Sequence, residues 1–85
     1  MGSKTFDGVR FSAYVDDHLP PHVHGFYAGV EVILELDFET RDIRLARRHD
    51  RVQPQNAKSS DVRRVRRAAE EYGEELFKLW EVARG

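Results

Sequence analysis

Three of the four histidines in the chain fall within the segment His18-Leu-Pro-Pro-His-Val-His24. If residues 22–24 are extended, side-chain alternation along a strand places the imidazoles of His22 and His24 on one face of a sheet. Pro20 and Pro21 restrict the backbone before these two residues, which fixes the relative positions of the histidines with little loss of conformational entropy. The segment therefore predicts a preorganised site, with His18 returning to meet His22 and His24.

This histidine cluster is compatible with three roles. Imidazoles titrate near neutral pH, so His22 and His24 can serve as acid and base in metal-independent phosphodiester cleavage, with His18 assisting. Neutral imidazoles also bind zinc, copper or nickel, and a carboxylate such as Asp16 or Asp17 can orient a metal-binding ring. In that interpretation the ligands are His22 and His24, and the cofactor is zinc or another divalent transition metal. The third role is structural, or a binding role without catalysis.

An arginine-rich stretch is the second candidate site. Residues 41–67 carry ten Lys and Arg side chains against three Asp, a net charge of +7, although the whole chain has a net charge of −1. Several arginines begin the predicted C-terminal helix, where the helix dipole favours negative charge. A solvated charged face is one explanation, and an RNA backbone or an acidic partner protein is the other. The residues predicted to bind nucleic acid are Arg44, Arg47, Arg48, Arg63, Arg64 and Arg67.

Apolar periodicity predicts the elements that position these residues. Alternation of apolar and polar residues favours four strands, over about residues 9–15, 22–27, 30–37 and 41–47. Asp7-Gly8 is a predicted turn or bulge and Ala28-Gly29 a predicted hairpin turn. Residues 48–59 are polar, which predicts a loop. Apolar residues then recur three and four apart as far as Ala83, which predicts one helix of about six turns.

Length and composition limit the class of protein. The 85 residues are 40% hydrophobic and 34% charged, as expected for one α+β domain over residues 1–85. We expect an antiparallel sheet of about four strands packed by one long C-terminal helix that is capped at Ser59 or Ser60. The chain contains no cysteine, and its first residues do not form a basic and apolar leader. A cytoplasmic protein without membrane contact is therefore expected.

Several short segments resemble one family of small bacterial proteins. They are Tyr14, Asp17-His18-Leu-Pro-Pro-His-Val-His24, Glu74-Glu75-Leu76 and Trp80, and the family is known as domain of unknown function 4160. The resemblance covers about residues 6–83 and carries over to His18, His22 and His24. It implies a toxin component of a two-gene toxin–antitoxin pair, with an antitoxin-like partner. The long loop over residues 48–59 departs from the family pattern.

Two functions from different classes follow from these features. The first is a toxin-type protein that binds RNA through its arginines and acts as a ribonuclease-like enzyme through the histidine cluster. The alternative is a non-catalytic module that binds a metal or a partner protein through the same histidines and the arginine-rich face. A homodimer is also expected, because the apolar stripe that reaches Trp80 exceeds what four strands can cover.

Overall fold

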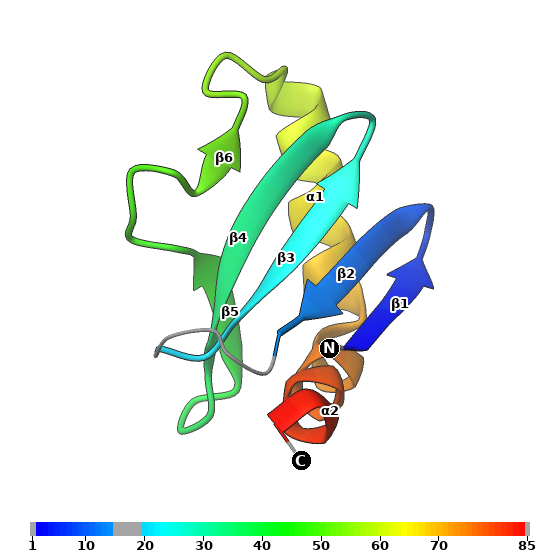
Figure 1. The fold of residues 1–85 in the computed structure, drawn as a ribbon, viewed down its shortest axis with the longest axis vertical. Helices are drawn as coiled ribbons and strands as arrows, with labels where there is room; N and C mark the ends of the chain where they lie inside the picture. Colours follow the sequence, from blue (N-terminus) through cyan, green and yellow to red (C-terminus); the bar gives the residue numbers. More distant parts are fainter. Residues whose placement is uncertain (1, 15–19, 85) are drawn as a thin grey trace.

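The computed structural model describes residues 2–14 and 20–84, which form one antiparallel sheet and two helices (Figure 1). The strands are β1 (Gly2–Phe6), β2 (Val9–Ala13), β3 (His22–Tyr27), β4 (Val30–Asp37), β5 (Asp42–Leu45) and β6 (Val52–Gln53). The helices are α1 (Ser59–Glu71) and α2 (Gly73–Arg84). The strand order is β1-β2-β3-β4-β5. Strand β6 pairs with the first part of β4, and β5 pairs with the last part of β4. The predicted α+β class is confirmed.

The prediction of about four strands is correct for β2 to β5 and misses the two outer elements. β1 has the sequence Gly-Ser-Lys-Thr-Phe and lies at an edge of the sheet, so it carries almost no apolar alternation. β6 has only two residues and lies inside the predicted loop over residues 48–59. The Ala28-Gly29 turn closes the β3–β4 hairpin, as predicted, and a turn at Asp7-Gly8 joins β2 to the unpredicted strand β1, with positive φ at all four residues.

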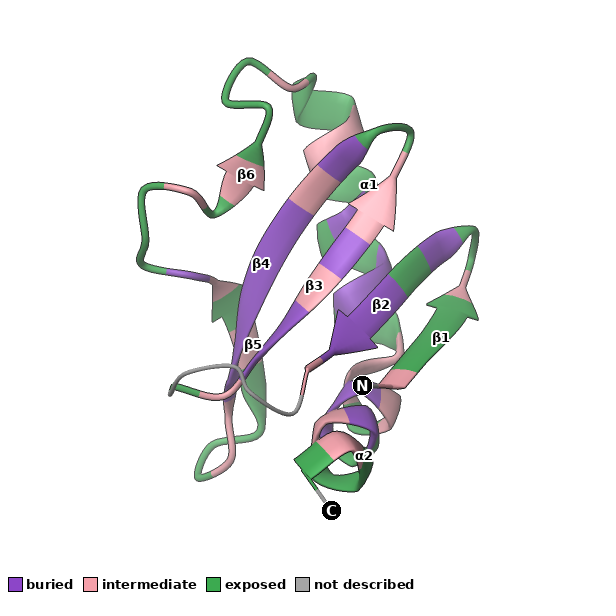
Figure 2. Ribbon diagram, viewed as in Figure 1, coloured by how far each residue is buried: buried purple, intermediate pink, exposed green. Residues whose placement is uncertain are grey.

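The hydrophobic core lies between one face of the sheet and the two helices (Figure 2). Gly25 of β3 shows how close this packing is, because a Cβ atom added there would lie 2.6 Å from Cγ1 of Val65 on α1. It would also lie 3.0 Å from the ring of Phe11 on β2. Since side chains alternate along a strand, the neighbours His24 and Phe26 face away from the helices.

The prediction of one long helix is wrong, because the chain bends at Tyr72 (φ −108°, ψ 30°) between α1 and α2. The Tyr72 ring stacks on Phe6 of the unpredicted strand β1, with ring centroids 4.6 Å apart. The bend directs α1 mainly over β3 and β4 and α2 over β1 and β2. The predicted serine cap is also wrong, since α1 starts after Lys58 and has no side-chain cap.

Two further findings concern the helices. Trp80 is half-buried, with its ring 5.2 Å from that of Phe38 and the Arg84 guanidinium 4.9 Å from its centroid. This packing removes the main reason for expecting a homodimer, and Val82 is the large hydrophobic residue left exposed in the described chain.

Within residues 2–14 and 20–84, no helix has the length and apolar character needed to span a membrane.

A pair of carboxyl groups lies beside the bend. A hydrogen bond to Asp7, together with the negative charge of Asp7, raises the pKa of Glu71 above its ordinary value. The Tyr72 hydroxyl donates to Asp7 Oδ1 at 3.3 Å, and the charges of Asp7 and Glu71 raise the pKa of that hydroxyl. The folded state therefore favours the protonated form of Glu71.

Glu71→Gln should raise the thermal unfolding midpoint near pH 7 and leave it unchanged near pH 3. A carboxyl group with a raised pKa contributes stability below its ordinary pKa, and that contribution is lost as pH rises through the raised value. The neutral amide keeps a donor for Asp7 at both pH values. Circular dichroism melts of Glu71→Gln and the matched variant Glu70→Gln measure the difference, and an equal shift at both pH values would contradict the assignment.

Candidate functional site

Strand β3 places His22 and His24 next to each other on the face of the sheet opposite the helices. Their ring centroids are 5.1 Å apart, as the strand alternation predicts. His22 is 5% exposed and the His24 side chain 13% exposed, so both rings lie mostly within the protein. His18, the third predicted member of the cluster, lies outside the described residues. The catalytic role of the three histidines stays a prediction.

Each imidazole of this histidine pair is oriented through its Nδ1 atom. His22 Nδ1 lies 2.9 Å from the carbonyl oxygen of Pro20, and His24 Nδ1 lies 2.7 Å from Glu31 Oε2. A carbonyl and a carboxylate only accept hydrogen bonds, so Nδ1 is the donor in both rings. In the neutral form, Nε2 is then the basic nitrogen of each ring, which is the tautomer that an acid–base residue or a metal ligand uses.

Side chains from β2 and β3 complete the surroundings of the pair. Tyr14, the residue after β2, has its ring edge-to-face with that of His24 at 5.0 Å between centroids, and the Phe26 ring is nearly parallel to the His24 ring at 6.5 Å. The Arg10 guanidinium covers Phe26 at 4.3 Å and donates to Ser12 Oγ at 3.0 Å. Arg10 and Phe26 cannot be singled out from the sequence, because their place beside the histidines depends on the pairing of β2 with β3.

The metal interpretation lacks a complete ligand set in the described chain. Among residues 2–14 and 20–84, no group of three His, Cys, Asp or Glu side chains is arranged to hold a metal ion. Glu31 resembles the carboxylate that orients a metal-binding histidine, since it contacts Nδ1 of His24. A metal at His22 and His24 would need at least one further ligand.

Two of the predicted RNA-binding arginines are engaged with nearby carboxylates. Arg44 Nη2 lies 2.7 Å from Asp37 Oδ2, and Arg48 forms two bonds of 2.7 and 2.8 Å with Asp50. Backbone hydrogen bonds from residues 39 and 40, with a smaller contribution from Arg44, lower the pKa of Asp37. The hydrogen bond from Arg48 lowers the pKa of Asp50. Much of the positive charge of residues 41–50 is thus balanced locally.

Arg64 and Arg47 are directed elsewhere. Arg64 leaves α1 toward the sheet, where it donates to the carbonyl oxygen of Asp7 at 3.0 Å and lies 5.3 Å from the centre of the Tyr27 ring. Arg47 donates its backbone amide to Glu35 Oε2 at 3.0 Å, and its side chain is 80% exposed. Neither residue lies in the groove described next.

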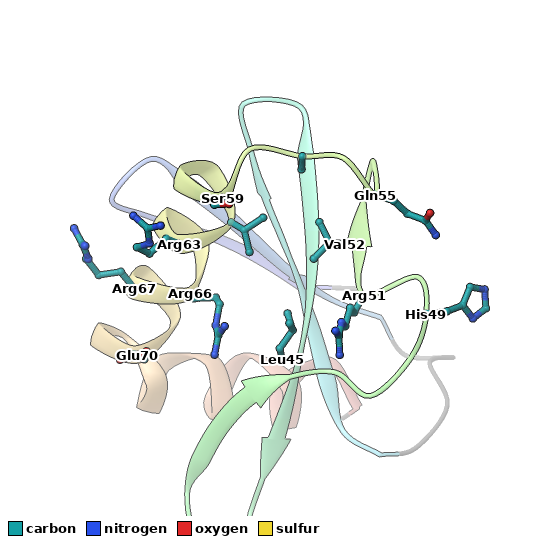
Figure 3. Close-up of a pocket in the computed structure, with 12 residues that line it drawn as sticks. Leu45, His49, Arg51, Val52, Gln55, Ser59, Arg63, Arg66, Arg67 and Glu70 are labelled. Carbon is teal, nitrogen blue, oxygen red and sulfur yellow. The ribbon is translucent and has the colours of Figure 1, made fainter.

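Four arginines line a groove of about 620 Å³ between α1 and the β5–β6 region (Figure 3). Arg63, Arg66 and Arg67 come from α1, and Arg51 comes from the segment just before β6. All are exposed, and within the described residues none of them forms an ion pair. The apolar part of the lining includes Leu45, Val52 and Val62. We call this site the arginine groove.

The arginine groove and the histidine pair lie on opposite sides of strand β4. Leu45 and Val52 of the groove pair with core residues of β4 that face the helices. Residues 46–51 run along the edge of β4 between the two sites, held by bonds from Ala46 N to Ile33 O (3.0 Å) and from Ile33 N to Arg51 O (2.8 Å). The structure therefore does not bring Arg63 or Arg67 to the histidines.

These features define a small α+β protein with helices on one face of a sheet, a histidine pair on the other face and a basic groove beside the first helix. The family model described as "Domain of unknown function (DUF4160)" matches residues 8–81, and the chain belongs to this family, as its histidine segment suggests. No curated protein and no solved structure matches the chain significantly.

Nitrogen-15 NMR of the neutral imidazoles should show the Nδ1–H tautomer for both His22 and His24. Each Nδ1 atom faces an oxygen that can only accept. Glu31→Ala should change the tautomer balance of His24 and leave that of His22 intact, because only His24 contacts Glu31. An Nε2–H tautomer for either ring in the wild-type protein would contradict this geometry.

Proposed function

We propose that the protein is a toxin-type bacterial protein that binds RNA in the arginine groove. The observation that carries this proposal is that four exposed arginines line one groove, without an ion pair among the described residues. Two of the arginines predicted from the sequence, Arg63 and Arg67, belong to this set. Arg51 and Arg66 are added to it by the fold.

The spacing of these arginines opposes local stability, which supports a binding role. Arg66 and Arg67 follow Arg63 in α1 by three and four residues, and like charges at this spacing on a helix repel one another. Their repulsion is relieved when phosphates neutralise them. Guanidinium groups bind phosphate oxygens through paired hydrogen bonds, and the release of counterions from RNA adds to the affinity.

Arg66→Ala and Arg51→Ala should each weaken the binding of a fluorescent single-stranded RNA by about tenfold, because each removes a charged hydrogen-bonding partner of phosphate. Each should also reduce the slope of log affinity against log salt by about 0.7. Arg64→Ala is the matched control, since it removes the same charge from the same helix outside the groove. Fluorescence anisotropy measures all three, and an equal effect of Arg64→Ala would contradict the proposal.

We further propose that His22 and His24, assisted by His18, cleave the bound RNA. The favouring observation is the pair of rings 5.1 Å apart, each oriented through Nδ1. One imidazole would take the proton of a ribose 2′-hydroxyl, whose oxygen attacks the adjacent phosphorus. The bond from phosphorus to the 5′-oxygen breaks, and the second imidazole protonates that oxygen. The RNA would reach the histidines over the β4 edge, where Arg47 and Arg48 lie.

His22→Ala and His24→Ala should each slow RNA cleavage by about 10²–10⁴-fold, since each removes one partner of the acid–base pair. Lys78→Ala is the control, because Lys78 is an exposed cation on α2 that belongs neither to the arginine groove nor to the histidine pair. The measurement is the rate of appearance of 2′,3′-cyclic phosphate ends on a labelled RNA. The same background rate in the wild type and in both pair variants would refute catalysis by the histidines.

The alternative proposal is a non-catalytic module that binds a metal ion or an acidic, antitoxin-like partner protein. Its support is the carboxylate of Glu31 on Nδ1 of His24, an arrangement common behind metal ligands. Under this proposal the arginine groove binds carboxylates of the partner instead of phosphates. Salt-sensitive binding to the product of a neighbouring gene, without affinity for RNA, would favour it.

Calorimetric titration with zinc, nickel and copper separates the metal proposal from catalysis by free imidazoles. If the metal proposal holds, the wild-type protein binds one ion and the double variant His22→Ala/His24→Ala does not. The affinity should fall as the pH decreases through the imidazole range, because protons compete for the nitrogen ligands. No heat of binding in the wild type, or binding that survives in the double variant, would rule out this metal site.

A further inference from the structure

The arginine groove contains aliphatic side chains that phosphate binding alone does not require. Val62 from α1 and Val52 from β6 line it from two sides, together with Leu45 from β5 (Figure 3). All three residues are only partly buried, so the fold leaves their side chains accessible within the groove. A ligand that fills the groove therefore has an apolar part as well as a negative charge.

Two arginines flank this aliphatic surface from different segments of the chain. Arg66 lies one helical turn after Val62, and Arg51 directly precedes Val52. Figure 3 shows their side chains on opposite sides of Leu45. Among the described residues that line the groove, Glu70 is the acidic one, and it lies one turn beyond Arg66. Its carboxylate repels phosphate, so a bound phosphate is favoured on the side of Arg66 that faces Arg51 and away from Glu70.

We infer that the arginine groove is a subsite for one unstacked nucleotide of single-stranded RNA. The base lies on the aliphatic surface of Val52, Val62 and Leu45, and the adjoining phosphate is held between Arg51 and Arg66. The volume of about 620 Å³ falls within the usual range for small-ligand sites, about 300–1,000 Å³. Bases of an RNA duplex are stacked and paired, so only a single strand can place a base there.

This inference rests on the RNA-binding function proposed above and adds the contact with the base. An acidic peptide would also form ion pairs with the arginines. A nucleobase in addition buries a flat, weakly polar ring on the aliphatic surface at small entropic loss. A nucleotide differs from an acidic peptide in that its base contributes to the binding affinity separately from its phosphate.

The test compares the binding of two fluorescent oligomers of equal length, oligoadenylate and an abasic ribose-phosphate chain with the same charge. Wild-type protein should bind oligoadenylate more tightly than the abasic chain. Val52→Thr keeps the shape of the side chain and adds a polar hydroxyl. It should therefore weaken the binding of oligoadenylate by about fivefold and leave the binding of the abasic chain unchanged. Arg66→Ala should weaken the binding of both oligomers.

The outcomes separate this inference from the proposed function. Equal binding of the two oligomers, or an equal effect of Val52→Thr on both, would overturn the nucleotide subsite while RNA binding stands. Failure of the wild-type protein to bind either oligomer would contradict the proposed function itself. Thermal melts verify that Val52→Thr is folded, and Val52→Ala provides the same comparison if it is not.

Discussion

The close contact between helix α1 and strand β3 at Gly25 determines how the rest of the molecule is arranged. A Cβ atom at this position would lie 2.6 Å from Cγ1 of Val65, so α1 lies directly on the backbone of β3. Because side chains alternate, the same contact turns His24 away from the helix and toward the opposite face of the sheet. It also sets the position of Val62 and Arg66 on α1, on the side of the helix that forms the arginine groove.

The arrangement of the histidine pair could be predicted in part. Alternation along residues 22–27 is sufficient to place His22 and His24 on one face. The partner of His24 follows from the same pattern, because the Ala28-Gly29 turn pairs Phe26 with Glu31 and leaves Glu31 diagonal to His24. The bend at Tyr72 could not be predicted, since the apolar stripe continues through it. It depends on packing against β1, an edge strand whose own sequence lacks a clear pattern.

The arginines show why a charged stretch of sequence is a poor guide to a binding surface. From the sequence they form one block, and the fold divides them according to the direction of each side chain. Asp37 and Asp50 balance Arg44 and Arg48. Arg64, although next to Arg63 in the sequence, is rotated about 100° around the helix axis and contacts β-hairpin residues instead. Arg51 and Arg63 come from separate segments and line the same groove because β6 pairs with β4.

Binding of RNA in the arginine groove between α1 and β6 can be tested by titrating nitrogen-15-labelled protein with a short single-stranded RNA and following the backbone amide signals. We expect the largest chemical-shift changes at Arg51, Val52 and the residues of α1 from Val62 to Arg67, with much smaller changes on β1. Changes that are confined to β1 or α2, or no changes at all, would contradict it.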